Sequence, residues 1–391
     1  MPDQFKEVTT TGLGGRFMKS IQGVILGVIL FALSFVVLFW NEGRVDTSKI
    51  AQNAVEVNAT ATSTDQSLQG KLVALSANLN SPDLVGDKAE AANFSAELKA
   101  DKYSAVKRKV EMYAWVEHTT SKTTKKTGGS ESTETTYDYK KEWVEDVPNT
   151  DDFKYKEDHQ NPSAPVKSTE NRVPSLFVGV YGVDSASIEL PPSTPLTLNT
   201  DKVVLSGAAK LMGQQYVFVA SSATSTIDMP NIGDLRISYE VVPVGTHVTA
   251  IGQLNGMNLE AYHDAKNNTL YRIFNGSKAD AVATLHQEYT TSLWILRLVG
   301  FLMMWFGLML FFEPLSTVLD ILPIFGSLSR GLIGVASFVV ALTLSIVTII
   351  ISLIVHNIIA LILAVAVIIG VIIFGLKFWR KTKAPAAPAQ T

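Results

Sequence analysis

The stretch IQGVILGVILFALSFVVLFW, residues 21–40, decides the fold class because it contains no charged side chain. A helix needs about 20 apolar residues to cross a hydrocarbon core of roughly 30 Å. Residues 293–312 also meet this length, and residues 332–376 are long enough for two passes, broken at His356-Asn357. The sequence therefore predicts four membrane spans, at residues 21–40, 293–312, 332–355 and 358–376.

Basic residues near the span ends predict the orientation, since Lys and Arg are retained on the cytoplasmic side. Arg16 and Lys19 precede the first span, Arg330 precedes the third, and residues 377–383 carry four more basic residues. We expect residues 1–20, 313–331 and 377–391 in the cytoplasm, with an interfacial helix in the 313–331 loop and a basic, then disordered tail. Residues 41–292 are expected on the other side, as a periplasmic or luminal domain.

The pattern of residues 41–292 is mainly that of strands. Alternation and turn residues predict strands at Lys71–Leu79, Ala105–His118, Thr133–Val147, Tyr216–Ala220, Asp234–Val242, His247–Leu254, Asn258–His263 and Thr269–Phe274. A helix at Ala279–Thr291, with Ser277 as its N-cap, is expected to continue into the second span. The fold class is thus a membrane protein with four transmembrane α-helices and a large β-rich α+β extracytoplasmic domain.

Two strand segments resemble each other. Residues 70–80 and 245–255 both read Gly-x-x-Val-x-x-x-x-x-Leu-Asn. The domain could therefore consist of two related sub-units, or the similarity could be chance between two amphipathic strands.

The strands at 105–118 and 133–147 flank a polar segment with Gly128-Gly129, which predicts a long β-hairpin. Tyr137, Tyr139 and Trp143 are in step along its second strand. They could form a recognition surface, or they could be cross-strand pairs that pack on the rest of the domain.

Composition excludes several chemistries. The chain has no cysteine, and its six histidines show no metal-ligand spacing, so we expect no metal and no cofactor. No nucleophile elbow or nucleotide-binding motif occurs, and a net charge of −3 does not favour nucleic acid. The spans hold almost no ionisable residue, which favours a membrane anchor over a transport pathway.

Several sequence blocks, in order, resemble the LUMA family, also called the transmembrane protein 43 family. They are NEGR at 41–44, VEMYAWVE at 110–117, TYDY at 136–139 with Glu142-Trp143, HQNPSA at 159–164, GDLR at 233–236, and VLD with LPIF at 318–325. The candidate site residues from these blocks are Asn41, Glu42, Gly43, Arg44, Glu111, Met112, Tyr113, Trp115, Tyr137, Tyr139, Trp143, His159, Asn161, Pro162, Gly233, Asp234, Arg236 and Pro323.

The resemblance implies four spans and a large luminal or periplasmic domain. Animal members are scaffolds of the endoplasmic reticulum and inner nuclear membrane that self-associate, and the family has no agreed enzymatic activity. For this chain we expect a bacterial member in the plasma membrane, or an endoplasmic reticulum or nuclear envelope location if it is eukaryotic.

The predicted function is that of a non-enzymatic, membrane-organising scaffold whose domain binds protein or lipid. Expected partners are membrane lipids, further copies of the chain in a homo-oligomer, and unidentified membrane or envelope proteins. A subunit of an oligomeric channel or transport complex is the alternative, and an envelope-lipid or glycan enzyme has least support.

Three motif blocks have specific expected roles. Residues 41–44 are expected to cap the first span and dock it under the domain. Residues 233–236 are expected to form a tight turn into a strand. Residues 159–164 are either a structured turn or a binding loop.

Overall fold

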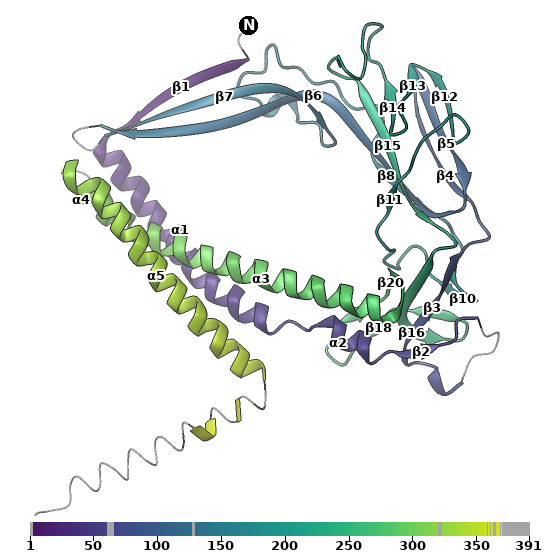
Figure 1. Ribbon diagram of the computed structural model, residues 1–391. Coiled ribbons are helices and arrows are strands. Elements are labelled where there is room, and N and C mark those ends of the chain that lie inside the picture. Colours follow the sequence, from purple (N-terminus) through teal and green to yellow (C-terminus); the bar gives the residue numbers. More distant parts are fainter. Residues whose placement is uncertain are drawn as a thin grey trace, which may run out of the picture. The chain divides into compact units, whose positions relative to one another are not determined.

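The computed structural model describes residues 3–60, 66–126, 130–319, 323–357 and, beyond these, 359, 361, 362, 365–367 and 369. The chain divides into two compact units. The β unit comprises Met1–Thr9, Asp46–Lys122 and Thr133–Tyr289, and the helical unit comprises Thr10–Val45, Thr123–Ser132 and Thr290–Thr391. Figure 1 shows the helices and strands of both units.

The largest sheet of the β unit has eight strands. Its order is β1 (Gln4–Thr11), β7 (Glu131–Val144), β6 (Tyr103–Lys125), β15 (Leu235–Pro243), β14 (Tyr216–Val219) and β13 (Ala209–Met212), with β8 (Thr169–Arg172) on β6 and β11 (Thr194–Pro195) on β15. The predicted hairpin is confirmed as β6 and β7, and it is longer than expected. β1 was not predicted, and it adds residues of the chain's N-terminal segment to this sheet.

Three smaller sheets complete the unit. The second has the order β2 (Val55–Val57), β3 (Leu72–Asn80), β9 (Leu176–Val178), β10 (Tyr181–Val183), β17 (Asn258–Glu260), β16 (His247–Asn255) and β20 (Arg272–Asn275). The third is β12 (Val203–Gly207), β5 (Phe94–Asp101) and β4 (Val85–Ala91), and the fourth is β18 (Tyr262–His263) with β19 (Thr269–Leu270). Helix α2 (Thr47–Gln52) precedes β2.

Alternation along the strands builds the core. On β6, Val106, Val110 and Met112 are all at most 4% exposed, whereas Lys107 and Lys109 between them face outward. Because successive side chains of a strand point to opposite faces, this alternation places one face of the sheet against the core. Burial of such side chains stabilises the fold by about 25 cal/mol per Å² of apolar surface removed from water.

The two similar segments are neighbours in the second sheet. β3 and β16 pair antiparallel with Leu75 opposite Ala250, which occupy equivalent positions in the two segments. The flanking hydrogen bonds match too, since Gly70 N donates to Leu254 O at 2.8 Å and Gly245 N donates to Leu79 O at 2.7 Å. Such two-fold symmetric pairing is what a duplicated unit would produce. The duplication itself remains a prediction.

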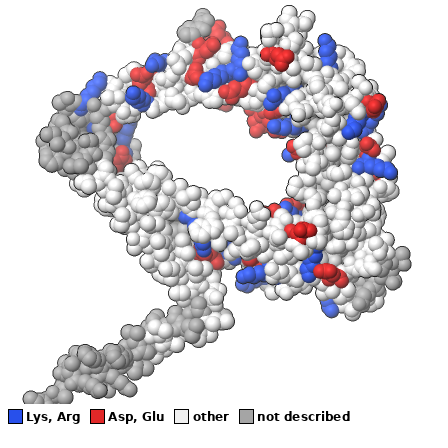
Figure 2. All heavy atoms as spheres, viewed as in Figure 1, with Lys and Arg blue, Asp and Glu red and all other residues white. Residues whose placement is uncertain are grey.

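The helical unit contains α1 (Leu13–Glu42), most of α3 (Lys278–Phe311), α4 (Glu313–Leu319) and α5 (Pro323–His356). Three of the described helices, α1, α3 and α5, are long and apolar enough to cross a membrane. Figure 2 shows that charged side chains are scattered over the strands and sparse along these helices. The chain is therefore a membrane protein with a large β-rich region.

Helices α1 and α3 run antiparallel with their backbones in close contact. A Cβ on Gly27 would lie 2.7 Å from Gly307 O, and a Cβ on Gly307 would lie 2.8 Å from Phe31 N. Further along, Leu38 packs on Gly300, so the contact continues toward the C-terminal end of α1. Small residues at such crossings let helices approach closely in a membrane.

The predicted helix N-cap at Ser277 is confirmed. Ser277 N and Oγ both donate to Asp280 Oδ2, at 2.8 and 2.7 Å, and α3 then runs unbroken for 34 residues. The hydroxyl and backbone bonds from Ser277 hold the pKa of the Asp280 carboxyl below its usual value. The third long helix, α5, ends at His356, where the sequence predicted a break. The fourth predicted span, 358–376, and the tail 377–391 lie largely or wholly outside the described residues.

Candidate functional site

Most of the candidate residues converge at the base of the β6–β7 hairpin, within the β unit. They come from β6, β7, the 159–164 segment, the turn before β15 and the start of β15. We call this group the hairpin-base cluster: Glu111, Met112, Tyr113, Trp115, Tyr137, Tyr139, Trp143, His159, Asn161, Pro162, Gly233, Asp234 and Arg236. Residues 41–44 belong to the helical unit.

Arg236 on β15 joins one half of the cluster. Its Nε donates to Glu111 Oε2 at 2.7 Å, and its guanidinium lies 4.9 Å from the Trp143 ring centroid and 5.2 Å from that of Tyr216. Burial alone would raise the pKa of the Glu111 carboxyl, but the hydrogen bonds and charges of Arg236 and Lys109 together outweigh it, and the pKa is lowered. Arg236 therefore acts as a planar cation held between two rings and a carboxylate.

The turn before β15 is held by Asp234, which is fully buried. Its carboxylate accepts from Ser221 N and Oγ, both at 2.6 Å, and from Asn231 N at 2.7 Å. Gly233 has φ +94°, which favours glycine, and a Cβ there would lie 3.2 Å from Pro162 Cγ. The prediction of a tight turn into a strand is confirmed.

The side chain of Asn161 extends the sheet beyond the start of β15. Its Oδ1 accepts from Trp115 N at 2.7 Å, and its Nδ2 donates to Trp115 O at 2.9 Å and to Pro148 O at 3.1 Å. The amide thus bonds the β6 backbone as the next residue of a neighbouring strand would. Because these polar atoms are bonded internally, the structure favours a structured turn over a binding loop for residues 159–164.

His159 is the centre of an aromatic stack. It is 2% exposed and lies 3.9 Å from the Tyr139 ring centroid, with the Trp115 ring edge-on at 4.7 Å. Its Nδ1 donates to Tyr155 O at 2.9 Å. The aromatic side chains of the hairpin therefore pack on the rest of the domain, which was the second of the two alternatives that the sequence left open.

Tyr139 bears the most strongly perturbed group of the cluster. Its hydroxyl donates to Glu117 Oε2 and accepts from Tyr155 N at 2.8 Å. Burial and the Glu117 carboxylate raise the pKa of Tyr139 to about 12. At neutral pH this hydroxyl is therefore protonated and does not act as a base. Its hydrogen bond with Tyr155 N holds the 153–155 segment in place.

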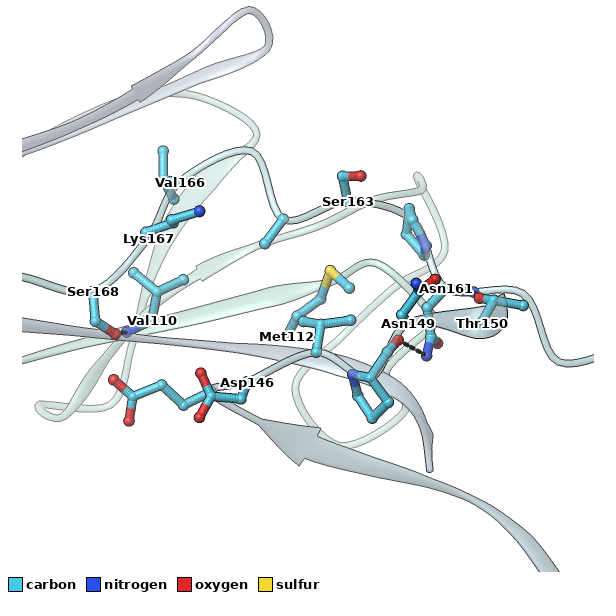
Figure 3. Close-up of a pocket in the computed structure, with 15 residues that line it drawn as sticks. Val110, Met112, Asp146, Asn149, Thr150, Asn161, Ser163, Val166, Lys167 and Ser168 are labelled. Atoms are coloured by element: carbon cyan, nitrogen blue, oxygen red, sulfur yellow. Dashed lines mark hydrogen bonds between the residues drawn. The ribbon is translucent and has the colours of Figure 1, made fainter. Parts of the chain in front are cut away.

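A cavity of about 640 Å³ lies beside the cluster. Figure 3 shows Val110 and Met112 on the strand side and the 145–150 and 161–168 segments around it. Two hydroxyls in its lining already accept hydrogen bonds from the backbone. Ser168 Oγ accepts from Val110 N at 3.0 Å, and Thr150 Oγ1 accepts from Asn161 N at 2.9 Å. Among the described residues that line the cavity, no hydroxyl is hydrogen-bonded to a carboxylate, lysine or histidine side chain.

One buried polar network was missed by the sequence reasoning. Arg108 Nη1 donates to Asp87 Oδ2 at 2.7 Å, and Asn171 Nδ2 donates to Asp87 Oδ1 at 2.9 Å. Arg108 Nε and Nη2 also donate to Lys167 O. The only local signal for Arg108 is the strand alternation, which places it on the same face as Val106 and Val110, whereas its neighbours Lys107 and Lys109 suggest an exposed basic segment.

The motif at residues 41–44 ties α1 to α3 within the helical unit. Glu42 accepts two hydrogen bonds from Arg297, at 2.7 and 2.8 Å, and its side chain is 1% exposed. Asn41 Nδ2 donates to Leu293 O at 3.0 Å, and Arg44 Nη1 donates to Ser292 Oγ at 2.7 Å. Helix α1 ends at Glu42 with Gly43 as C-cap. The predicted capping is confirmed, and docking of this motif under the domain stays a prediction.

The remaining motif residue, Pro323, is the first residue of α5. The predicted short helix before it corresponds to α4, and residues 320–322 lie outside the described residues. Within the described part of the chain, no three His, Asp or Glu side chains are grouped as a metal site. Where the side chains of the motif residues are described, their polar atoms are used mainly in internal bonds.

Comparison with known proteins shows which family the chain resembles. The family described as "Transmembrane protein 43" matches residues 112–358. "Transmembrane protein 43" of Homo sapiens is 27% identical over 363 residues (88% of this chain, 87% of that protein), and the mouse protein is 26% identical over 357 (85% and 84%). The Drosophila melanogaster homolog is 26% identical over 294 residues (72% and 74%). No solved structure matches significantly. The chain belongs to the transmembrane protein 43 family.

Proposed function

We propose that this protein is a non-enzymatic integral membrane scaffold that self-associates in the membrane and binds protein or lipid through its β-rich domain. The observation that carries the proposal is that the side chains of the motif residues interact with other residues of the same unit. Arg236, Asp234, His159 and Glu42 all bond or stack within their own unit. A catalytic site would instead direct such groups at a cavity.

The surface of the helices supports self-association. On α5, Val335, Val339, Ile346 and Ile350 are 48–65% exposed, and none of the other described helices covers them. In a bilayer such residues face lipid or another copy of the chain. The domain is assigned to the extracytoplasmic side, in a bacterial plasma membrane or in the endoplasmic reticulum of a eukaryote.

Cysteine scanning tests the self-association directly, because the chain has no cysteine of its own. Single cysteines are placed along α5 at Val335, Val339, Ile346 and Ile350, with Ala341, which is fully buried, as the matched control. Oxidation in native membranes is expected to give disulfide-linked dimers at one helical face and none at Ala341. Monomers at every position, with no cross-linked neighbour of any kind, would overturn the proposal.

A further inference from the structure

The edge of β7 holds the chain's own N-terminal segment through an aromatic contact. Tyr139 N donates to Asp3 O at 2.7 Å, so β1 extends the sheet through a backbone bond. Phe5 stacks on Tyr155 with ring centroids 4.3 Å apart and planes 15° apart. The Phe5 ring also meets Tyr139 and His159 edge-on, at 6.0 and 6.2 Å. We call this surface, made by the β7 edge with Tyr139, Tyr155 and His159, the strand-acceptor site.

Two charged contacts lie beside the aromatic one. Lys6 Nζ is 2.7 Å from Glu134 Oε1, and Lys154 Nζ is 3.4 Å from Glu7 Oε2. All four side chains are more than 40% exposed, so these ion pairs contribute little binding energy. They mainly determine how β1 aligns with β7 and which sequences can bind there. The occupant that fits the site is an extended segment with an aromatic side chain followed by a basic and an acidic residue.

The helical unit restricts where this occupant can come from. α1 and α3 are antiparallel along their apolar lengths, from the Gly27–Gly307 contact to the Asn41–Leu293 bond. The ends at Glu42 and Leu293 lead into the β unit through Asp46 and Tyr289, whereas the opposite end of α1 leads to β1. When this pair crosses a bilayer, residues 3–9 are on one face and residues 46–289 are on the other.

The β strands themselves cannot bridge that separation. β6 and β7 contain Lys122, Glu134 and Lys140 among many other polar residues, and a charged side chain in hydrocarbon is costly. An open sheet edge is also not tolerated in lipid. Pairing of β1 with β7 therefore excludes crossing of α1 in the same molecule.

We propose that the strand-acceptor site is closed by residues 3–9 only while α1 has not crossed the bilayer. In the inserted protein it is open, and it binds an extended, aromatic-bearing peptide segment of a partner on the domain's side of the membrane. This proposal rests on the proposed function, since it assigns one protein-binding surface to the scaffold. Binding would occur by strand addition, with main-chain bonds for affinity and the aromatic slot for specificity.

The first experiment tests whether the site is open in a bilayer. The full chain is reconstituted in lipid vesicles with Lys6→Cys and Glu134→Cys, and a short bismaleimide is added on both sides. Ser121→Cys with Thr135→Cys is the matched control, because their hydroxyls are 3.2 Å apart across the hairpin. The control pair is expected to cross-link and the 6/134 pair is not. Cross-linking of the 6/134 pair to the same extent as the control overturns the proposal.

The second experiment tests what the open site binds. A fluorescent peptide with the sequence of residues 3–11, DQFKEVTTT, is supplied both inside and outside lipid vesicles. These vesicles contain the protein with its own sequence, without the introduced cysteines. Saturable binding is expected. It should weaken at least tenfold when the peptide's Phe is replaced by Ala, and similarly with Tyr155→Ala in the protein.

Absence of binding, or equal binding of the Phe→Ala peptide, overturns the proposal. The peptide variant keeps the test decisive even if Tyr155→Ala fails to fold. Neither result bears on self-association of the helices, which is measured separately in native membranes.

Discussion

The Glu42–Arg297 pair gives the sharpest test of how the helices are held together. The substitution Glu42→Gln removes the carboxylate that accepts both guanidinium bonds, at 2.7 and 2.8 Å, from a side chain that is 1% exposed. Breaking a buried ion pair on one side costs about 3–5 kcal/mol, because a buried charge loses its partner. Arg297 keeps 18% exposure, so we expect a loss of about 3 kcal/mol, at the low end of that range.

Steric trapping in micelles measures this loss as a change in the free energy of unfolding. The control is Glu90→Gln, whose pair with Lys88 is exposed and should give no measurable change. Replacing both partners, Glu42→Leu with Arg297→Leu, should recover most of the loss, since no charge is left buried. A cost under about 1 kcal/mol for Glu42→Gln, or a double variant less stable than the single one, would show that this pair does not hold the helices together.

Three further predictions concern the β unit, and equilibrium unfolding followed by tryptophan fluorescence checks each one. Asn161→Ala removes the amide that bonds Trp115 N and O, so we expect a loss of about 2 kcal/mol; an unchanged midpoint would show that water replaces the amide. Gly233→Ala, at φ +94°, should cost about 1–2 kcal/mol, and unchanged stability would contradict the strain argument. The pKa of Tyr139 is raised from 10.0 to about 12, so its contribution is full below pH 10 and is lost as pH rises toward about 12. With Tyr139→Phe, the free energy of unfolding should change less between pH 10 and about 12 than it does in the unaltered protein. An unaltered pH profile would contradict the assignment of this titration to Tyr139.

Local pattern was sufficient for the helices and the hairpin. Uninterrupted apolar runs predicted α1, α3 and α5, and alternation predicted β6, β7, β15 and β16 close to their observed positions. Ser277 and Asp280 predicted the start of α3, because a capping box is a short-range interaction. The motif blocks named residues that the structure brings together at the hairpin base, but nothing in the sequence predicted that they meet.

Non-local interactions could not be read from the sequence. β1 is Thr-rich and polar, and only its pairing with β7 makes it a strand. The side chain of Asn161 bonds the backbone of β6 at Trp115, beyond the residues that pair with β15. This contact depends on where β15 begins, which the local sequence does not reveal. Arg108 and Asp87 are 21 residues apart, and their burial follows from sheet packing alone. The fourth predicted span and the sidedness of each unit remain predictions.

Self-association of the protein in the membrane can be measured as its mass in native-lipid particles. The protomer has a mass of 42.5 kDa. The mass should be determined over a wide range of protein concentrations, without a detergent step. We predict one fixed multiple of the protomer mass, retained on dilution. A mass of one protomer at every concentration would show that the protein does not self-associate.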